Sequence, residues 1–189
     1  MAPLRNGEGS GFFEKYYDRI YVYLRSLLRD SNEAEDMAQE TFLRAHSRRD
    51  TLKDPGALLS WLYSIATRAA LDRLRQRSAV AARESAIDVA EIDPPDPGLP
   101  TLEQGLEQDQ MSACVNRFVI GLPDTYRAVL LLHDMNGLTG PEIAAGLDIP
   151  LATVKVRLHR ARRKLKAALE DGCAFTCDSR GVLVCEPKK

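Results

Sequence analysis

The clearest chemical pattern in this sequence is a cationic run between Leu151 and Leu169. The run contains no acidic residue and seven basic ones: Lys155, Arg157, Arg160, Arg162, Arg163, Lys164 and Lys166. Basic side chains neutralise phosphates and release counterions, and arginines near a helix N-terminus can donate two hydrogen bonds to a guanine edge. The run therefore predicts contact with duplex nucleic acid. A solvated basic face without a ligand is the competing interpretation.

A second pattern is the group of cysteines Cys173, Cys177 and Cys185 near the C-terminus. Thiols at this density indicate metal or redox chemistry in a reducing compartment. The spacing does not match a strong zinc signature, so a fourth ligand would be water, a histidine such as His159 or another chain. We expect that the chain requires no cofactor. A metal ion or a disulfide at these cysteines is the one candidate for a bound group or a cross-link. Packing as small buried hydrophobic side chains is an equal alternative, and Cys114 is assigned to the core.

No pattern for catalysis accompanies these groups. The histidines His46, His133 and His159 are scattered, and neither a glycine-rich phosphate loop nor a nucleophile motif is present. We predict that the chain is not an enzyme.

Composition is that of an ordinary globular protein, with 44% hydrophobic and 28% charged residues. The net charge of -1 hides an acidic stretch, 78–111, where Arg83 is the only base. No segment approaches the roughly 18 apolar residues of a membrane span, and the N-terminus lacks the apolar core of a signal peptide. We expect a cytoplasmic protein without membrane insertion.

The elements that must position the basic run are helical. Apolar residues recur at three- and four-residue spacing and predict helices over 12–29, 32–46 and 58–77, the second capped by Ser31 or Asn32. The proline-rich stretch Ile92–Pro100 cannot hold a helix, so we expect residues 78–103 to be extended.

Helical periodicity returns from about 106 to 170, with breaks at 121–123, 136–137 and 148–150, and predicts a second, smaller helical domain. After Gly172 two β-prone runs flank the turn 178–181. They predict a hairpin that brings Cys173 close to Cys185.

The basic run itself belongs to a predicted helix-turn-helix. Thr139 and Glu142 fit a capping box with Pro141 in the first turn, and Asp148–Pro150 form a short turn. A second helix then starts at Ala152 or Thr153 and lies in the major groove. Its core stripe consists of Val154, Leu158, Ala161, Leu165 and Leu169.

These segments, in this order, resemble an RNA polymerase sigma factor of the extracytoplasmic-function (ECF) family. The segments 122–127, 142–144 and 153–162 are similar to the C-terminal domain of that family. The segment Ala34–Ala45 resembles the helix that docks on the polymerase clamp, and Trp61–Ala66, with Asp72 and Arg75, resembles the helix that opens the −10 element.

The resemblance implies an all-α fold of two small helical domains, a sigma region 2 bundle and a sigma region 4 helix-turn-helix, joined by a flexible linker. The short C-terminal β-hairpin is an appendage to this pattern. The implied limits are region 2 at 10–78, an acidic proline-rich linker at 79–105, region 4 at 106–170 and a cysteine-containing tail at 171–189.

The implied function is promoter-specific transcription initiation, in a stress or a metal or redox response. The implied partners are the clamp helices of core RNA polymerase and promoter DNA, double-stranded at −35 and single-stranded at −10, with an anti-sigma factor as a further candidate. The alternative is a stand-alone helix-turn-helix regulator, for which charge reversal at Asp36 and Glu40 would leave activity intact.

The resemblance also assigns roles to individual residues. Asp36, Gln39 and Glu40 face the polymerase, while Met37, Phe42 and Leu43 pack inward. The −35 contacts are Thr153, Lys155, Arg157, His159 and Arg160. The −10 contacts are Arg48, Arg49, Lys53, Arg68, Arg73 and Arg75, whereas Trp61 is assigned to the core.

The sequence departs from the family pattern at four positions. Arg68 replaces a usual asparagine, Ala152 and Asp148 replace usual glycines, and Val156 replaces a small polar residue. Asp148 tolerates the left-handed conformation better than most residues. A further hypothesis is that the acidic linker docks on the basic helix in the free protein.

Overall fold

The computed structural model describes residues 9–52, 54–84, 115–177 and 183–187, and all its helices lie between Gly9 and Gly172. The N-terminal elements are α1 (Gly9–Leu28), α2 (Ser31–Ser47), the 3-10 turns η1 (Arg49–Thr51) and η2 (Pro55–Ala57), and α3 (Leu58–Glu84). After helical residues 115–120 come α5 (Asp124–Leu130), the π-helix η3 (Leu131–Met135), α6 (Gly140–Leu147), α7 (Leu151–Gly172), β1 (Cys173–Cys177) and β2 (Leu183–Pro187). Among the described residues, no helix is both long and apolar enough to cross a membrane.

The first three long helices pack into a bundle, as their periodicity predicts. Each contributes a stripe of buried side chains to one core: Ile20, Leu24 and Leu27 from α1, Ala34, Ala38 and Phe42 from α2, and Leu62, Ala66 and Ala70 from α3. The alanines let the helices approach closely. A buried hydrogen bond of 2.7 Å between the Tyr23 and Thr67 hydroxyls satisfies these two polar groups inside the bundle.

Two local predictions in this bundle are wrong. The N-cap of α2 is Asp30, whose carboxylate accepts a hydrogen bond of 2.9 Å from the Glu33 amide, so Ser31 and Asn32 are already helical. Residues 78–84, predicted to be extended, continue α3 because Ala, Arg and Glu are strong helix formers. The proline-rich part of the predicted linker lies outside the described residues.

The C-terminal helices form a second unit. The helix made by α5 and η3 ends at Asn136 and Gly137, the latter with φ 73°, where the sequence predicts a break. Buried apolar side chains from each element join in this unit: Val129, Leu132, Ile143, Val154 and Leu158. The predicted all-α fold of two small helical domains is confirmed.

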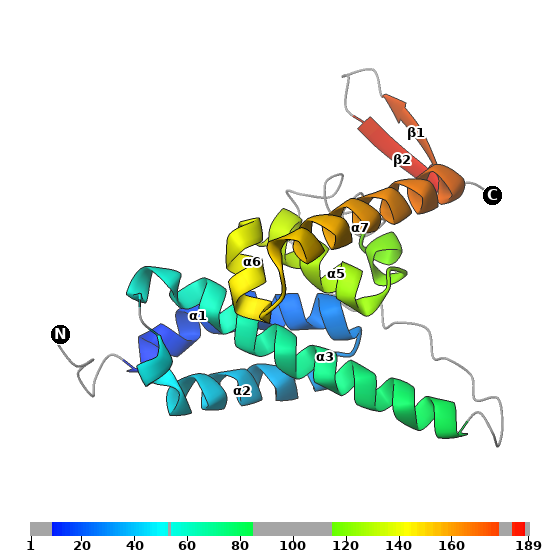
Figure 1. Ribbon diagram of the computed structural model, residues 1–189. Helices are drawn as coiled ribbons and strands as arrows, with labels where there is room; N and C mark the ends of the chain where they lie inside the picture. Colours follow the sequence, from blue (N-terminus) through cyan, green and yellow to red (C-terminus); the bar gives the residue numbers. More distant parts are fainter. Residues whose placement is uncertain (1–8, 53, 85–114, 178–182, 188–189) are drawn as a thin grey trace.

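The two units pack directly against each other, with α6 and α5 against α3 (Figure 1). The Tyr63 hydroxyl of α3 donates a hydrogen bond of 2.6 Å to Asn136 Oδ1 across this contact. A Cβ atom added at Gly146 in α6 would lie 3.0 Å from the Ser64 Cβ, so glycine permits the close approach of these helices. The buried core is continuous across both units.

The predicted hairpin is present as two antiparallel strands at the far end of α7 (Figure 1), and its turn, 178–182, lies outside the described residues. Cys185 pairs with Phe175, whereas Cys173 pairs with Pro187 and Cys177 with Leu183. Cys173 and Cys185 are therefore diagonal to each other and not directly paired, and the prediction that the hairpin brings them to a separation suitable for a disulfide is wrong. Diagonal positions in such a ladder are about 7–8 Å apart, more than a disulfide normally spans.

Candidate nucleic-acid interface

The helix-turn-helix begins with the predicted capping box at α6. The Glu142 amide donates to Thr139 Oγ1 at 3.4 Å, and the Thr139 amide donates back to Glu142 Oε2 at 2.8 Å. The Thr139 hydroxyl also donates to this carboxylate at 2.6 Å and is the main cause that lowers the pKa of Glu142. These bonds satisfy free amides at the helix start and fix where α6 begins.

The turn between the two helices depends on Asp148. This residue caps α6 in the left-handed region, with φ 56° and ψ 50°, which confirms the tolerance expected of aspartate there. The Ile149 amide then donates to the Ala144 carbonyl oxygen at 3.1 Å. Helix α7 begins at Leu151, slightly before the predicted start at Ala152 or Thr153, so the turn holds α6 and α7 close together.

Helix α7 buries one stripe, and its other faces are exposed or half-buried. Val154, Leu158 and Ala161 are buried as predicted, and α7 packs against α5, α6 and β1. The five predicted −35 contacts lie in its first three turns, with Lys155, His159 and Arg160 exposed and Thr153 and Arg157 half-buried. The structure thus brings these five side chains together on one stretch of helix surface.

Two arginines of α7 have partners within the same unit. Arg160 Nη1 contacts the Tyr126 hydroxyl at 3.4 Å, and this contact is the main cause that lowers the pKa of Tyr126. Arg162 donates from Nε at 3.0 Å and from Nη2 at 2.5 Å to the two oxygens of Asp134. Since this pair lowers the pKa of Asp134 and neutralises the charge of Arg162, Arg162 contributes little positive charge to the surface.

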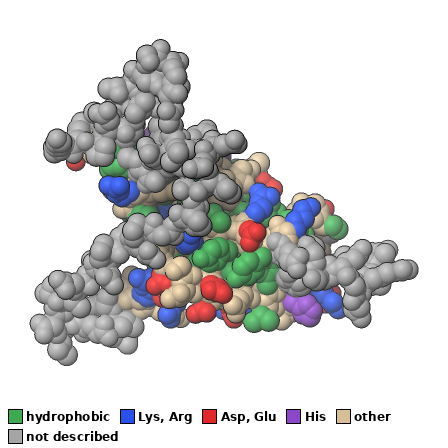
Figure 2. Space-filling model, turned by 180° about the vertical axis from the view of Figure 1, so that it is seen from behind, with side chains coloured by type: hydrophobic (Ala, Val, Ile, Leu, Met, Phe, Trp, Pro, Cys, Tyr) green, Lys and Arg blue, Asp and Glu red, His purple; other side chains and the backbone are tan. Residues whose placement is uncertain are grey.

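The predicted polymerase-docking residues lie on α2. Asp36 and Gln39 are exposed, and Asp36 has no ion pair within the described ranges. Glu40 is half-buried and accepts a hydrogen bond of 2.7 Å from Arg44 Nε. Figure 2 shows acidic side chains gathered on the lower part of the face seen from behind, at the level of α2. The helix therefore presents a partly acidic surface.

One inward-facing prediction for α2 is wrong. Phe42 is buried and Met37 is half-buried against the core, but the Leu43 residue is 66% exposed. The buried stripe of α2 passes through Ala38 and Ala45, and a position directly after Phe42 is turned about 100° away from it. Leu43 is consequently an exposed apolar side chain beside the acidic surface.

The predicted −10 contacts are spread along the N-terminal unit. Arg48 and Arg49 are exposed directly after α2, Arg68 is exposed on α3, and Lys53 lies outside the described residues. Arg75 pairs with Asp72 at 2.6 Å. The half-buried Trp61 packs against the core, as predicted.

Sequence reasoning missed a three-residue ion-pair cluster between α2 and α3. Glu33 accepts from Arg73 at 3.1 Å and from Arg77 at 2.8 Å. Since these residues are 40 and 44 positions from Glu33, no local signal could have indicated the pairing. The cluster leaves Arg73 a weaker candidate for DNA contact than Arg68, which has no ion pair among the residues that the structure describes.

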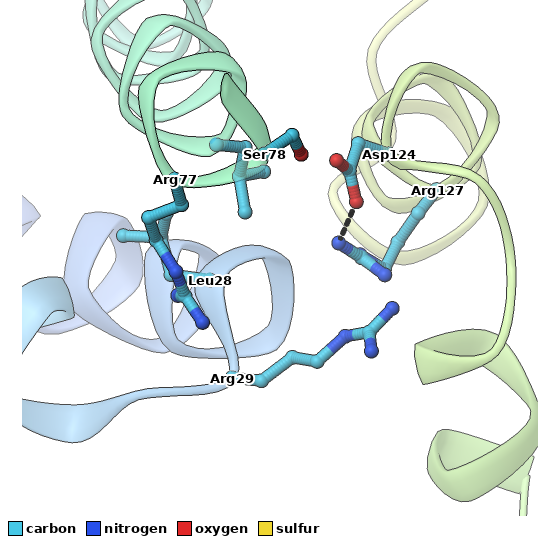
Figure 3. Close-up of a pocket in the computed structure, with 7 residues that line it drawn as sticks. Leu28, Arg29, Arg77, Ser78, Asp124 and Arg127 are labelled. Carbon is cyan, nitrogen blue, oxygen red and sulfur yellow. Dashed lines mark hydrogen bonds and ion pairs between the residues drawn. The ribbon is translucent and has the colours of Figure 1, made fainter. Parts of the chain in front are cut away.

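A pocket of about 270 Å³ lies where the two units meet (Figure 3). It is lined by residues from α1, α3 and α5 and by the residue directly after α1: Leu28, Arg29, Leu74, Arg77, Ser78, Asp124 and Arg127. Arg127 is fully buried and was not among the predicted functional residues. The only sequence signal for it is a charged side chain at the start of the apolar run Ala128–Leu132.

In the cysteine-containing tail, Cys173 is buried. The side chains of Cys177 and Cys185 lie outside the described part of the structure. No group of three metal-ligating side chains occurs among the residues that are described.

Comparison with known proteins finds two matching family models. The Sigma-70 region 2 model matches residues 12–80, and the Sigma-70, region 4 model matches residues 112–165. The first match covers the α1–α3 bundle, and the second covers the helix-turn-helix.

Known relatives are similar over most of their length. The chain is 35% identical over 181 residues to the ECF RNA polymerase sigma factor SigW of Bacillus subtilis (strain 168), a match that covers 90% of this chain and 95% of that protein. It is 32% identical over 172 residues to the ECF RNA polymerase sigma factor SigK of Mycobacterium tuberculosis (strain ATCC 25618 / H37Rv), covering 87% and 89%.

Two solved structures support the fold. The sigma factor RpoE in complex with the anti-sigma factor NepR from Bartonella quintana aligns with a TM-score of 0.65 at 20% identity, over 85% of this chain and 96% of that chain. CnrH in complex with the cytosolic domain of CnrY aligns with a TM-score of 0.58 at 24% identity, over 86% and 87%.

Proposed function

The chain belongs to the ECF family of RNA polymerase sigma factors, and we propose that three separate surfaces bind the polymerase, the −35 element and the −10 element. As a sigma factor it binds core RNA polymerase and promoter DNA, directs promoter-specific initiation and is not an enzyme. In our proposal α2 docks on the polymerase, α7 reads the −35 element, and the segment from η1 through α3 holds the −10 strand. We propose domain limits of 10–78 for region 2, 79–105 for the linker, whose first residues continue α3, 106–170 for region 4 and 171–189 for the cysteine-containing tail.

For polymerase docking we assign Asp36, Gln39 and Glu40. The support is the exposure of Asp36 and Gln39 on a helix that is otherwise anchored to the bundle by its alanine stripe. An exposed carboxylate on a rigid helix suits a basic partner surface, because the charges are complementary and the backbone needs no ordering on binding. The polymerase clamp helices are the partner that we assign to this surface.

For the −35 element we assign Thr153, Lys155, Arg157, His159 and Arg160. The observation that carries this assignment is the exposed cationic start of α7, oriented by the capped α6 and the left-handed turn at Asp148. The first turns of a recognition helix reach base edges, and later turns lie over the phosphates.

For the −10 element we assign Arg48, Arg49, Lys53, Arg68, Arg73 and Arg75 as contacts to a single strand. Cations along a groove hold the backbone of an opened strand. Arg68 is exposed and lacks an ion pair among the described residues, so it can bind a phosphate directly. Arg73 and Arg75 would exchange Glu33 and Asp72 for phosphates.

Promoter binding requires the two helical units to separate. The positions −35 and −10 differ by roughly 25 nucleotides, which is about 85 Å of B-form duplex at about 3.4 Å per base pair. In the closed arrangement, the Tyr63 hydroxyl and Asn136 Oδ1 are 2.6 Å apart across the two units. We therefore propose that this arrangement is a resting form. An anti-sigma factor that holds it closed is a candidate partner.

For the tail we propose a metal or redox response through Cys173, Cys177 and Cys185. The support is that the three cysteines lie on the two paired strands, with Cys185 diagonal to both others, and that α7 continues directly into β1. A change at the tail would therefore reach the −35 helix. Because this register disfavours a disulfide between the cysteines, the proposed response is metal binding or oxidation of individual thiols. Metal analysis and thiol titration of the full chain, compared with a Cys177→Ser/Cys185→Ser variant, test this proposal; equal metal content and equal thiol reactivity at the remaining cysteines would contradict it.

We also propose that the protein acts in the cytoplasm, where its polymerase is.

Run-off transcription with purified core polymerase and a promoter library tests the whole assignment. The test variant is Asp36→Lys, and the matched control is Asp18→Lys, which reverses an exposed charge on α1. We expect promoter-specific transcripts from the native chain and the control, and none from Asp36→Lys, while duplex binding by α7 persists in all three. Undiminished transcription by Asp36→Lys would refute the docking role.

A further inference from the structure

Two arginines from different helical units converge on one backbone oxygen. Arg29, directly after α1, and Arg127, in α5, both donate to the carbonyl oxygen of Ile120, Arg127 Nη1 at 2.8 Å. Figure 3 shows the two guanidinium groups pointing toward each other in the pocket between the units. Like charges this close repel each other unless an anion lies nearby.

Arg127 is incompletely satisfied although it is fully buried. Its Nη1 also donates to the Leu122 carbonyl oxygen at 3.1 Å, and its Nη2 donates to Asp124 Oδ1 at 2.5 Å. Its Nε has no hydrogen-bond partner within the described residues. Burial, followed by the charge of Arg29, lowers the pKa of Arg127 to about 10. A buried donor without an acceptor is unfavourable and is commonly satisfied by an ordered water, an ion or a ligand.

The charge lining the pocket is predominantly positive. Arg29, Arg77 and Arg127 provide three cations, whereas Asp124 is the one carboxylate among the lining residues. Arg77 shares the carboxylate of Glu33 with Arg73, so its charge is only partly compensated. The pocket is therefore matched to a ligand that carries more than one negative charge.

We propose that this pocket binds a small phosphate-bearing anion through Arg29 and Arg77 of the N-terminal unit and Arg127 of the C-terminal unit. Guanidinium groups are planar forks that donate paired hydrogen bonds to phosphate oxygens. The volume of about 270 Å³ is slightly below the roughly 300–1,000 Å³ of pockets that hold drug-sized ligands. It therefore suits a phosphate or diphosphate group.

Binding at this position couples the anion to domain closure. The three arginines meet only when the two units are in contact, so the ligand binds the closed form and not the separated form. At a concentration about one hundred times its Kd, such a ligand raises the ratio of closed to open molecules about a hundredfold. The anion is thus a negative regulator of promoter binding.

Isothermal titration calorimetry of the full chain with inorganic phosphate and with pyrophosphate, at constant ionic strength, tests the site. The first variant is Arg29→Asn, because Arg29 is exposed with φ 66° and asparagine tolerates that conformation. The second variant is Arg77→Gln, which tests the same anion site if Arg29→Asn does not fold. The control is Lys15→Gln, which removes an exposed charge about 21 Å away along α1.

We expect saturable binding of at least one of the two anions by the native chain and by Lys15→Gln, and at least tenfold weaker binding by each arginine variant. Absence of saturable binding at millimolar anion, or an equal loss in Lys15→Gln, would overturn the proposal. The titration contains no polymerase and no promoter. Its failure would therefore leave the transcription assignment untouched, and a failed transcription assay would leave the anion site untouched.

Discussion

The hydrogen bond between Tyr63 and Asn136 should control how often the two helical units separate. Tyr63→Phe removes the donor of this 2.6 Å bond and leaves the aromatic ring in the core. A typical intramolecular hydrogen bond contributes about 1 kcal/mol, which corresponds to about a fivefold change in an equilibrium constant. We therefore expect the ratio of open to closed molecules to rise about fivefold.

The assay is single-molecule energy transfer between dyes at Lys15 and Ala167, which are exposed positions in the two units. Tyr23→Phe is the matched control, because its hydroxyl bonds Thr67 within the α1–α3 bundle at 2.7 Å. Both variants should lose about 1 kcal/mol of unfolding free energy in urea. Only Tyr63→Phe should enlarge the open population. An unchanged population in Tyr63→Phe, or an equal increase in Tyr23→Phe, would refute the reasoning.

Three further predictions concern the C-terminal unit. Thr139→Ala removes the cap of α6 and should lower the unfolding free energy in urea by about 1 kcal/mol; no loss would mean that the capping box is not stabilising. Because Arg162 lowers the folded-state pKa of Asp134, the stability lost in Asp134→Asn should be greatest at neutral pH, above the unfolded pKa of about 3.9, and should disappear as pH falls through the folded value; a pH-independent difference in urea unfolding argues against the ion pair. Lys155→Ala should reduce the slope of log affinity against log salt for a −35 duplex by about one, whereas Arg162→Ala should leave it nearly unchanged because Asp134 already neutralises that charge; equal slopes for both variants would contradict this.

Most of the helix-turn-helix could be predicted from sequence because its determinants are local. Thr139 and Glu142 are three residues apart, and Asp148 follows α6 directly, so the cap and the turn depend on neighbours along the chain. The buried stripe of Val154, Leu158 and Ala161 follows from helical geometry alone. The errors at Leu43 and at the N-cap of α2 are small displacements within a helix that was correctly expected.

Partners far apart in the chain could not be predicted. Glu33 holds Arg73 and Arg77, and Tyr63 contacts Asn136, because the packing of α2 on α3 and of α6 on α3 brings these side chains together. The hairpin was expected, but the register that pairs Cys185 with Phe175 does not follow from the spacing of the cysteines along the chain.

The sequence by itself determined the helices, the two-domain order, the cationic face of α7 and the family resemblance, since periodicity, capping and charge are read from residues close together. The tertiary structure alone decided that the two units close on each other and that Arg29, Arg77 and Arg127 line one pocket. Which charges meet across an interface depends on the three-dimensional packing of whole helices. No spacing along the chain specifies it.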